Sequence, residues 1–271
     1  MSEKDVTAVD VSVVIVNHNH RPVIEKCFES LYSLPDHASF ETILIDNTCH
    51  DGVSEWVAEH YPLAEIRRNT VRRGFAANAN TGMRELRRGR YALLLNPDVI
   101  CLPGLLDRMV AFMDNEPRAA IAAPKLCHPD GTPEPNCRCF PTPGILAARA
   151  LRIDKFWQSR DMQRYLMVKG EHSSATQVDW VTGAALVARR SAVETVGFMD
   201  ERYFLYWEDL DWCYRMRRTG WAVYRVPQAR AIHRARREGV RRPFGRAQRA
   251  QIFGAIRFFR EFGWNAGKVA R

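Results

Sequence analysis

Short apolar runs alternate with amphipathic stretches through the first half of the chain, a pattern that predicts an α/β fold with a mainly parallel sheet. The run VSVVIVN is continuous and β-branched, which is typical of a strand covered on both faces. Strands are predicted at residues 11–17, 41–47, 63–67 and 90–96. Helices are predicted at residues 22–31, 51–60, 75–88 and 103–115.

The second half is less regular. Turn-forming residues fill HPDGTPEPNCRCFPTPG at 128–144, which predicts a long surface loop, since apolar runs beyond it resemble further strands of the same sheet. Residues 147–169 are predicted to form an amphipathic helix, and residues 178–193 a strand and a short helix. We expect one domain at residues 1–240 and a basic amphipathic helical extension at residues 241–271.

Composition narrows the class of protein. Forty Lys and Arg against 31 Asp and Glu give a formal charge of +9, which suggests an anionic partner: a nucleotide, a phospholipid surface or a nucleic acid. Seven cysteines without a CxxC pair, and no charged-then-apolar leader, favour a reducing cytoplasm. Cys127, Cys137 and Cys139 near His128 lack the second pair of a zinc site, so we interpret them as ordinary thiols. No apolar run approaches the roughly 20 residues that span a bilayer.

Polar side chains follow the predicted strands at one edge of the sheet: Asn17, Asp46, Asn47, Asn96 and Asp98. In open α/β sheets the ligand crevice lies outside the carboxyl ends of the strands, so we expect these groups to converge there. A carboxylate at such an edge can accept hydrogen bonds from a base or ribose, or hold a hard cation. Alternatively, Asp46 caps the next turn, and NPD is a common turn sequence.

The stretch RRGFAANANTG places Gly74 before a predicted helix that carries Asn78 and Asn80. Arginines and a helix N-terminus suit a phosphate, and small residues permit close approach. The stretch is not a P-loop, because no GKS or GKT follows. A plain helix start is the alternative.

The stretch FLYWEDLDWCYRMRRTGW puts Glu208, Asp209 and Asp211 between Trp207 and Trp212. We interpret it as a buried strand that hands over to a helix N-terminus. Acids in a first turn satisfy free backbone N–H groups and oppose the helix dipole. Alternatively, a carboxylate in a partly apolar cleft acts as a general base with a raised pKa.

Several of these blocks together resemble family 2 glycosyltransferases of the GT-A fold, and most closely their bacterial rhamnosyltransferase-like branch. The blocks, in order, are VSVVIVNHN, ILIDNTCHDG, GFAANANTG, YALLLNPDV, VTGAALVARR, FLYWEDLDWCYR and a late IH, within residues 11–235. The resemblance implies a Rossmann-like nucleotide-sugar-binding fold whose mainly parallel sheet is flanked by helices. It also implies an inverting transferase that moves L-rhamnose from dTDP-rhamnose, or a hexose from a UDP-sugar, to a cell-surface glycan or lipid-linked acceptor.

The resemblance assigns roles to particular residues. Donor contacts are implied for Asn17, Asp46, Asn47, Gly74, Asn78 and Asn96, with Asp46 at the base. The metal motif, often DxD, stands here as Asn96-Pro97-Asp98, so Asp98 is the expected carboxylate ligand of Mg²⁺ or Mn²⁺, completed by His233. Asp209 matches the catalytic base. Trp207, Glu208 and Asp211 are expected beside the acceptor, although Glu208 and Asp211 can also cap the helix or pair with Arg215.

The C-terminal region is strongly basic. Residues 230–249 hold eight arginines and one glutamate, and IFGAIRFFREFGW follows. A basic amphipathic helix with Phe and Trp can lie in an anionic membrane surface, or it can pack its aromatic stripe on the catalytic domain. We expect a cytoplasmic protein, in peripheral contact with the cytoplasmic face of the inner membrane in the first case. No nucleic-acid partner is expected, because no recognised binding module contains the charge.

Two rival functions are weighed against this interpretation. A nucleotidyltransferase would show a Gly-rich signature with basic residues after the first strand, and NHNHRPV does not supply one. A non-catalytic nucleotide-sugar or membrane-binding module would be favoured by loss of the base or the metal ligand, yet Asp209 and Asp98 are both present.

Overall fold

The computed structural model describes residues 8–85, 88–151, 159–167, 173–234 and 245–266. Its helices are α1 Arg21–Tyr32, α2 Val53–His60, α3 Phe75–Glu85, α4 Leu105–Asn115, α5 Pro143–Ala150, α6 Arg160–Tyr165, α7 Arg190–Val196, α8 Glu208–Arg218 and α9 Arg246–Phe262. Its strands are β1 Val9–Asn17, β2 Phe40–Asp46, β3 Glu65–Arg68, β4 Gly89–Leu95, β5 Val99–Cys101, β6 Ala119–Cys127, β7 Pro133–Glu134, β8 Cys137–Arg138, β9 Thr176–Val178, β10 Trp180–Val181, β11 Ala185–Arg189 and β12 Ala222–His233.

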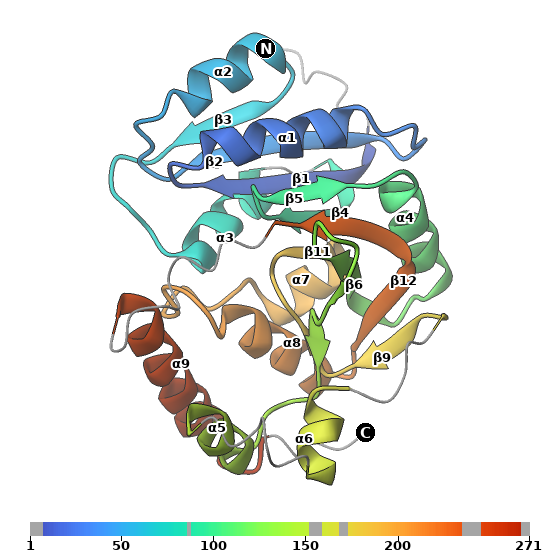
Figure 1. Cartoon of the computed structure of the whole chain (residues 1–271). Helices are drawn as coiled ribbons and strands as arrows, with labels where there is room; N and C mark the ends of the chain where they lie inside the picture. Colours follow the sequence, from blue (N-terminus) through green and yellow to red (C-terminus); the bar gives the residue numbers. More distant parts are fainter. Residues whose placement is uncertain (1–7, 86–87, 152–158, 168–172, 235–244, 267–271) are drawn as a thin grey trace.

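A twisted sheet of ten strands forms the centre of the molecule, in the order β3-β2-β1-β4-β11-β6-β12-β5, with β7 and β9 at its margins (Figure 1). The four strands from β3 to β4 are parallel, as the sequence predicts. The second half makes the sheet mixed, because β11 runs antiparallel to both β4 and β6, and β5 runs antiparallel to β12. The nucleotide-binding edge expected from sequence therefore belongs to the parallel half.

Helices bury an apolar core against each face of the sheet. One core packs α1, α2 and α4 against the sheet and includes Ile24, Phe28, Val57 and Met109. The other packs α3, α7 and α8 on the opposite face and includes Ala79, Met83, Val193 and Trp212. Strands such as β1 and β4 are buried on both sides, which explains why they read as continuous apolar runs.

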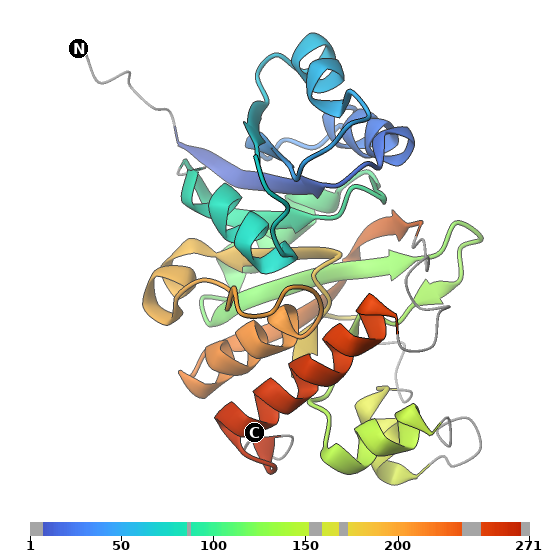
Figure 2. The same cartoon turned by 90° about the vertical axis from the view of Figure 1, so that its left-hand side faces the viewer.

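Helix α9 packs on the domain through its aromatic stripe, which is one of the two expectations for this segment. Phe258 and Phe259 are buried against Trp207 and α8. Figure 2 shows the α9 ribbon lying alongside that of α8. Gly254 permits this approach, since a Cβ at that position would lie 2.5 Å from Trp207 Cδ1. The predicted boundary at residues 240–241 lies outside the described residues. Along the part of the chain that the structure describes, no helix has the length and apolarity to cross a membrane.

Two local predictions are wrong. The single helix expected at residues 147–169 is replaced, within the described residues, by α5 and α6, and α5 begins earlier because Thr142 caps it ahead of Pro143. The acids of α8 follow an irregular segment rather than a buried strand. Tyr206 and Trp207 there have φ angles of 67° and 75°, in the left-handed region, which no strand permits.

Candidate active site

The carboxyl ends of β1 and β2 bring Asn17 and Asp46 side by side in the strand register. Asn17 is fully buried and directs its Nδ2 toward Cys49 Sγ at 3.4 Å. Asp46 accepts hydrogen bonds from the Cys49 backbone N–H at 2.7 Å and from the Ser54 hydroxyl. Burial raises the pKa of Asp46, but these hydrogen bonds outweigh it and the net pKa is lowered. An ionised Asp46 therefore caps the turn after β2, as the alternative interpretation foresaw.

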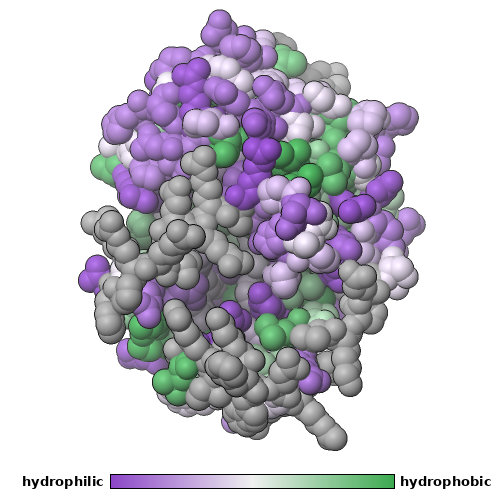
Figure 3. Space-filling view, in the orientation of Figure 1, coloured by the Kyte–Doolittle hydropathy of each residue, from purple (hydrophilic) through white to green (hydrophobic). Residues whose placement is uncertain are grey.

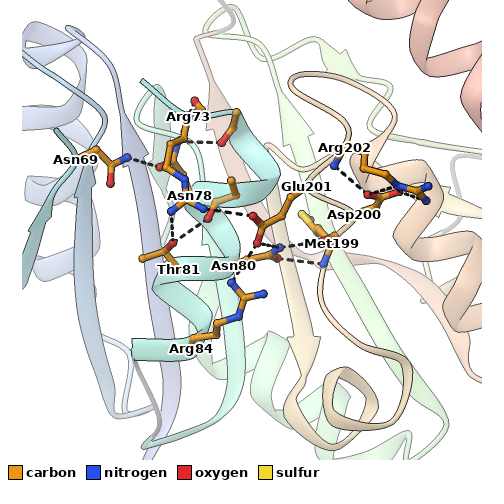
Figure 4. Close-up of polar contacts among 12 residues, drawn as sticks. Asn69, Arg73, Asn78, Asn80, Thr81, Arg84, Met199, Asp200, Glu201 and Arg202 are labelled. Carbon is orange, nitrogen blue, oxygen red and sulfur yellow. Dashed lines mark hydrogen bonds and ion pairs between the residues drawn. The ribbon is translucent and has the colours of Figure 1, made fainter. Parts of the chain in front are cut away.

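Three asparagine side chains hold the segment that leads into α3 through hydrogen bonds. Asn47 accepts from the Arg73 N–H at 2.9 Å and donates to the Arg73 carbonyl at 2.9 Å. Asn69 donates to Asn47 at 3.1 Å, and Asn78 donates to the Gly74 carbonyl at 2.9 Å. Asn69 also donates to Asn78 at 2.6 Å (Figure 4). In this structure Asn47 and Asn78 thus bind the backbone of Arg73 and Gly74, in the loop that is predicted to contact the donor.

Gly74 is required by a contact within the protein. A Cβ on Gly74 would lie 2.7 Å from the Phe204 carbonyl oxygen and 2.8 Å from Phe204 Cα. The neighbouring Phe75 N–H donates to the same oxygen at 2.9 Å. We expected the glycine to permit close approach of a phosphate, whereas the close approach observed is that of the backbone that leads into α8.

A network of charged and polar side chains also connects α3 and the loop before it to the segment before α8. Glu201 accepts from Asn80 at 3.0 Å and pairs with Arg84 at 3.1 Å and with Arg73 at 3.3 Å (Figure 4). Asn80 also exchanges hydrogen bonds with both backbone groups of Met199. The donor-side loop and the segment before α8 are consequently held as one unit.

Asp98 and His233 are brought together by the pairing of β12 with β5, where His233 lies opposite Val99. His233 Nε2 is 3.2 Å from Asp98 Oδ1, and its Nδ1 is 2.9 Å from Glu134 Oε2. Burial lowers the pKa of His233, but the two carboxylates raise it more strongly, to about 9. Asn96 opens the turn that presents Asp98: its N–H donates to the Ala184 carbonyl, and its carbonyl accepts from Val99.

The spacing of Asp98 and His233 suits a divalent cation. Adjacent ligands of an octahedral Mg²⁺ at about 2.1 Å lie roughly 3 Å apart, and the observed separation is 3.2 Å. Among the described residues no three His, Cys, Asp or Glu side chains form a metal site by themselves. The pair can supply two ligands, and the remaining positions fall to substrate oxygens or water.

The acids that open α8 differ sharply in environment. Asp209 is half-buried and accepts from the Gly183 N–H at 3.0 Å and from the Leu210 N–H at 2.8 Å. Burial raises the pKa of Asp209, and these N–H groups oppose the rise. Glu208 is buried, and its burial beside Asp209 raises its pKa well above the usual range. The N–H groups bound to Asp209 favour its ionised form, whereas the pKa of Glu208 rises more strongly and is opposed by its own backbone N–H.

Trp207 and Asp211, for which acceptor contacts are predicted, are both buried in this structure. Trp207 is covered by α9 and donates its indole N–H to Gln251 at 3.2 Å. Asp211 is 1% exposed and accepts from Arg215 at 2.7 Å, the pairing that was the alternative. Burial raises the pKa of Asp211 to about 6 despite that arginine. Helical spacing puts Glu208 and Asp211 on the buried side of α8, since i and i+3 share a face.

Comparison with known proteins decides the family. The model described as glycosyl transferase family 2 matches residues 12–197. The chain belongs to glycosyltransferase family 2. It is 29% identical over 231 residues to an N-acetylglucosaminyl-diphospho-decaprenol L-rhamnosyltransferase of Mycobacterium tuberculosis, covering 82% of this chain and 75% of that one. It is 26% identical over 257 residues to rhamnosyltransferase WbbL of Escherichia coli, covering 92% of each.

Solved structures agree on the fold. GalNAc-T7 with UDP, GalNAc and Mn²⁺ matches with a TM-score of 0.65 and 16% identity, over 86% of this chain and 45% of that one. Mannosyltransferase PcManGT from Pyrobaculum calidifontis with GDP-Man and Mn²⁺ matches with a TM-score of 0.56 and 14% identity, over 97% and 75%. This family 2 glycosyltransferase therefore has the predicted GT-A fold.

Two contacts in this glycosyltransferase were missed by sequence reasoning. Glu134 orients His233 from the Pro-rich loop, where no periodicity marks it. Gly183, whose N–H binds Asp209, lies in VTGAALVARR, a block of the resemblance to which no role was given. The block itself was the signal that could have pointed to Gly183.

Proposed function

We propose that this glycosyltransferase moves a sugar with inversion from a nucleotide sugar to a hydroxyl of a lipid-linked or cell-surface glycan. The support is the geometry of Asp209, whose carboxylate accepts hydrogen bonds from the Gly183 and Leu210 N–H groups beside the buried Glu208. Where two neighbouring carboxyls have different environments, the one whose charged form is held by N–H donors is the better candidate for the base. The first donor to test is dTDP-L-rhamnose, because two relatives are named rhamnosyltransferases, and the second is a UDP-hexose.

The chemistry needs a single displacement. Asp209 accepts the proton of the acceptor hydroxyl as its oxygen attacks the anomeric carbon, and the nucleoside diphosphate leaves from the opposite face. One displacement inverts the configuration, so no second carboxylate nucleophile is needed. Burial of Glu208 beside Asp209 raises the pKa of Glu208, which disfavours a second negative charge next to the base.

Donor binding is assigned to the carboxyl ends of the parallel strands, with Asn17 and Asp46 toward the nucleoside. Asp98 and His233 would hold the cation, whose bound charge stabilises the departing diphosphate as a Lewis acid. Asn47, Gly74 and Asn78 shape the loop between these groups, and Asn96 shapes the turn that carries Asp98.

A lipid-linked acceptor agrees with the name of the mycobacterial relative, which specifies a diphospho-decaprenol substrate. We assign the reaction to the cytoplasmic face of the inner membrane, where such an acceptor would meet a nucleotide sugar made in the cytoplasm. The basic C-terminal region supports a peripheral contact there.

The test is the variant Asp209→Asn, measured by initial rates with dTDP-rhamnose or UDP-hexoses, an acceptor and Mn²⁺. Because the amide cannot take the hydroxyl proton, transfer should fall by roughly 10²-fold or more, the scale of general-base loss. Donor affinity by calorimetry should remain. Glu208→Gln is the matched control, since an amide resembles a protonated acid and should cost far less. Near-normal turnover in Asp209→Asn, or a deeper loss in Glu208→Gln, would show that the wrong carboxyl has been assigned.

A further inference from the structure

Helix α9 carries a second group of apolar side chains, called here its outer face, which remains exposed. Ile252, Phe253 and Ile256 are 49%, 67% and 47% exposed, and Ile256 shares a helix face with Ile252 and Phe253, which precede it by four and three residues. Small hydrophobic groups are visible at the lower left of Figure 3, in the region that α9 occupies in Figure 1. Phe258 and Phe259 on the inner face are buried, whereas the side chains of the outer face remain largely exposed to solvent.

A groove of about 770 Å³ runs between α9 and the segment 202–206. From that segment Phe204 and Leu205 add apolar side chains that are 53% and 37% exposed. Two elements distant in sequence thus present large hydrophobic groups to the same groove, with Phe253 and Ile256 on its α9 side. Contiguous exposed apolar surface of this kind marks an interaction site.

The groove is also positively charged. Arg202, Arg257, Arg260 and Glu261 line it, so three positive charges and one negative leave a net charge of +2. Glu261 is already paired with Arg202 at 2.6 Å. The chain just before α9 is arginine-rich as well. Apolar side chains rimmed by arginines fit the interface of an anionic bilayer. A second copy of this +9 chain would bring the same charge against it.

One wall of the groove, the segment 202–206, leads along the chain to the proposed catalytic base. Phe204, on its wall, binds Phe75 through its carbonyl and lies against Gly74 at the donor-side loop. The same segment continues directly into Glu208 and Asp209 at the start of α8. A membrane surface seated at the groove would therefore lie next to the place where an acceptor hydroxyl must arrive.

We propose that the outer face of α9, together with Phe204 and Leu205, docks on an anionic phospholipid bilayer. This orientation presents Asp209 to the head group of a lipid-linked acceptor. The inference rests on the proposed function only for the identity of that acceptor. The docking itself follows from exposure and charge.

The test is co-sedimentation of the full chain with vesicles of phosphatidylglycerol and phosphatidylethanolamine, against vesicles of phosphatidylcholine. The chain should partition onto the anionic vesicles, and Phe253→Asp and Leu205→Asp should each weaken that partitioning roughly tenfold. Leu63→Asp is the matched control, because Leu63 is 90% exposed but far from the groove in sequence and fold. It should bind vesicles like the natural chain.

Three outcomes would overturn the docking proposal. In the first, Phe253→Asp binds anionic vesicles as well as the natural chain does. In the second, Leu63→Asp loses as much vesicle binding as Phe253→Asp. In the third, sedimentation velocity shows self-association that Phe253→Asp abolishes, which would make the occupant a second copy. Circular dichroism confirms that each variant is folded. Transfer to a soluble acceptor fragment keeps the two proposals apart: Phe253→Asp should retain it, whereas Asp209→Asn should lose it yet still bind vesicles.

Discussion

Raising the pH through 9 should destabilise the metal-free protein, because it removes the proton that His233 shares with two carboxylates. His233 donates toward Asp98 at 3.2 Å and toward Glu134 at 2.9 Å. These contacts raise its pKa from an ordinary 6.5 to about 9. The side chain of His233 is 11% exposed, so solvent screens the interaction only weakly.

The sign and size follow from that shift. A group whose pKa is higher in the folded than in the unfolded state stabilises the fold while it is protonated. The contribution of His233 is therefore full below pH 6.5 and is lost as the pH rises through about 9. At 1.36 kcal/mol per pKa unit, the shift corresponds to about 3 kcal/mol of unfolding free energy.

The assay is urea unfolding with a chelator present, followed by tryptophan fluorescence at pH 6 and pH 9.5. The natural chain should exceed His233→Gln in unfolding free energy by about 3 kcal/mol more at pH 6 than at pH 9.5. Comparing the two proteins at each pH cancels the titration of groups they share. A stability difference that is the same at both pH values would refute the assignment of the proton to His233.

Two further changes test the architecture around the site. Glu134→Gln should weaken Mn²⁺ binding by roughly tenfold or more, because it disturbs the bond that orients the His233 ring. Asp130→Asn, on the same loop, is the control and should leave Mn²⁺ binding unchanged. Mn²⁺ affinity is measured by titration followed by electron paramagnetic resonance. Equal Mn²⁺ affinities of Glu134→Gln and the natural chain would contradict this role of Glu134. Gly74→Ala should lower the unfolding free energy by about 1–3 kcal/mol, since the new methyl meets the Phe204 backbone. An unchanged urea midpoint would mean that the backbone around Gly74 or Phe204 shifts to accommodate the methyl group at little cost.

The first half of the fold could be predicted from sequence because its signals are local. A parallel strand buried on both faces is a continuous apolar run, and β1, β2 and β4 end within two residues of their predicted bounds. Pairing in the second half is set by residues far apart, so the antiparallel place of β11 between β4 and β6 was not foreseeable. The single helix predicted at residues 147–169 was wrong because the prediction followed the amphipathic pattern. It passed over Thr142 and Pro143, which mark the start of a helix.

The site was predicted in part. The resemblance named Asp98 and His233, and the structure places them in contact. The burial of Trp207 and Asp211 could not be predicted, because the packing of α9 and the ion pair with Arg215 decide which side chains are buried. Their contact with the acceptor stays a prediction. Glu134 could not have been found, since its approach to His233 depends on the short pairing of β7 with β6.

The position of β12 between β6 and β5 constrains how the chain can be assembled or shortened. Both neighbours leave the ribosome long before β12 does, so each keeps an open edge until residues 222–233 arrive. Open strand edges are templates for association between nascent chains. A fragment cut at residue 197, where the family match ends, would keep these edges and lack Asp209 and His233. Such a fragment is expected to aggregate, and expression trials should therefore retain the chain at least through β12.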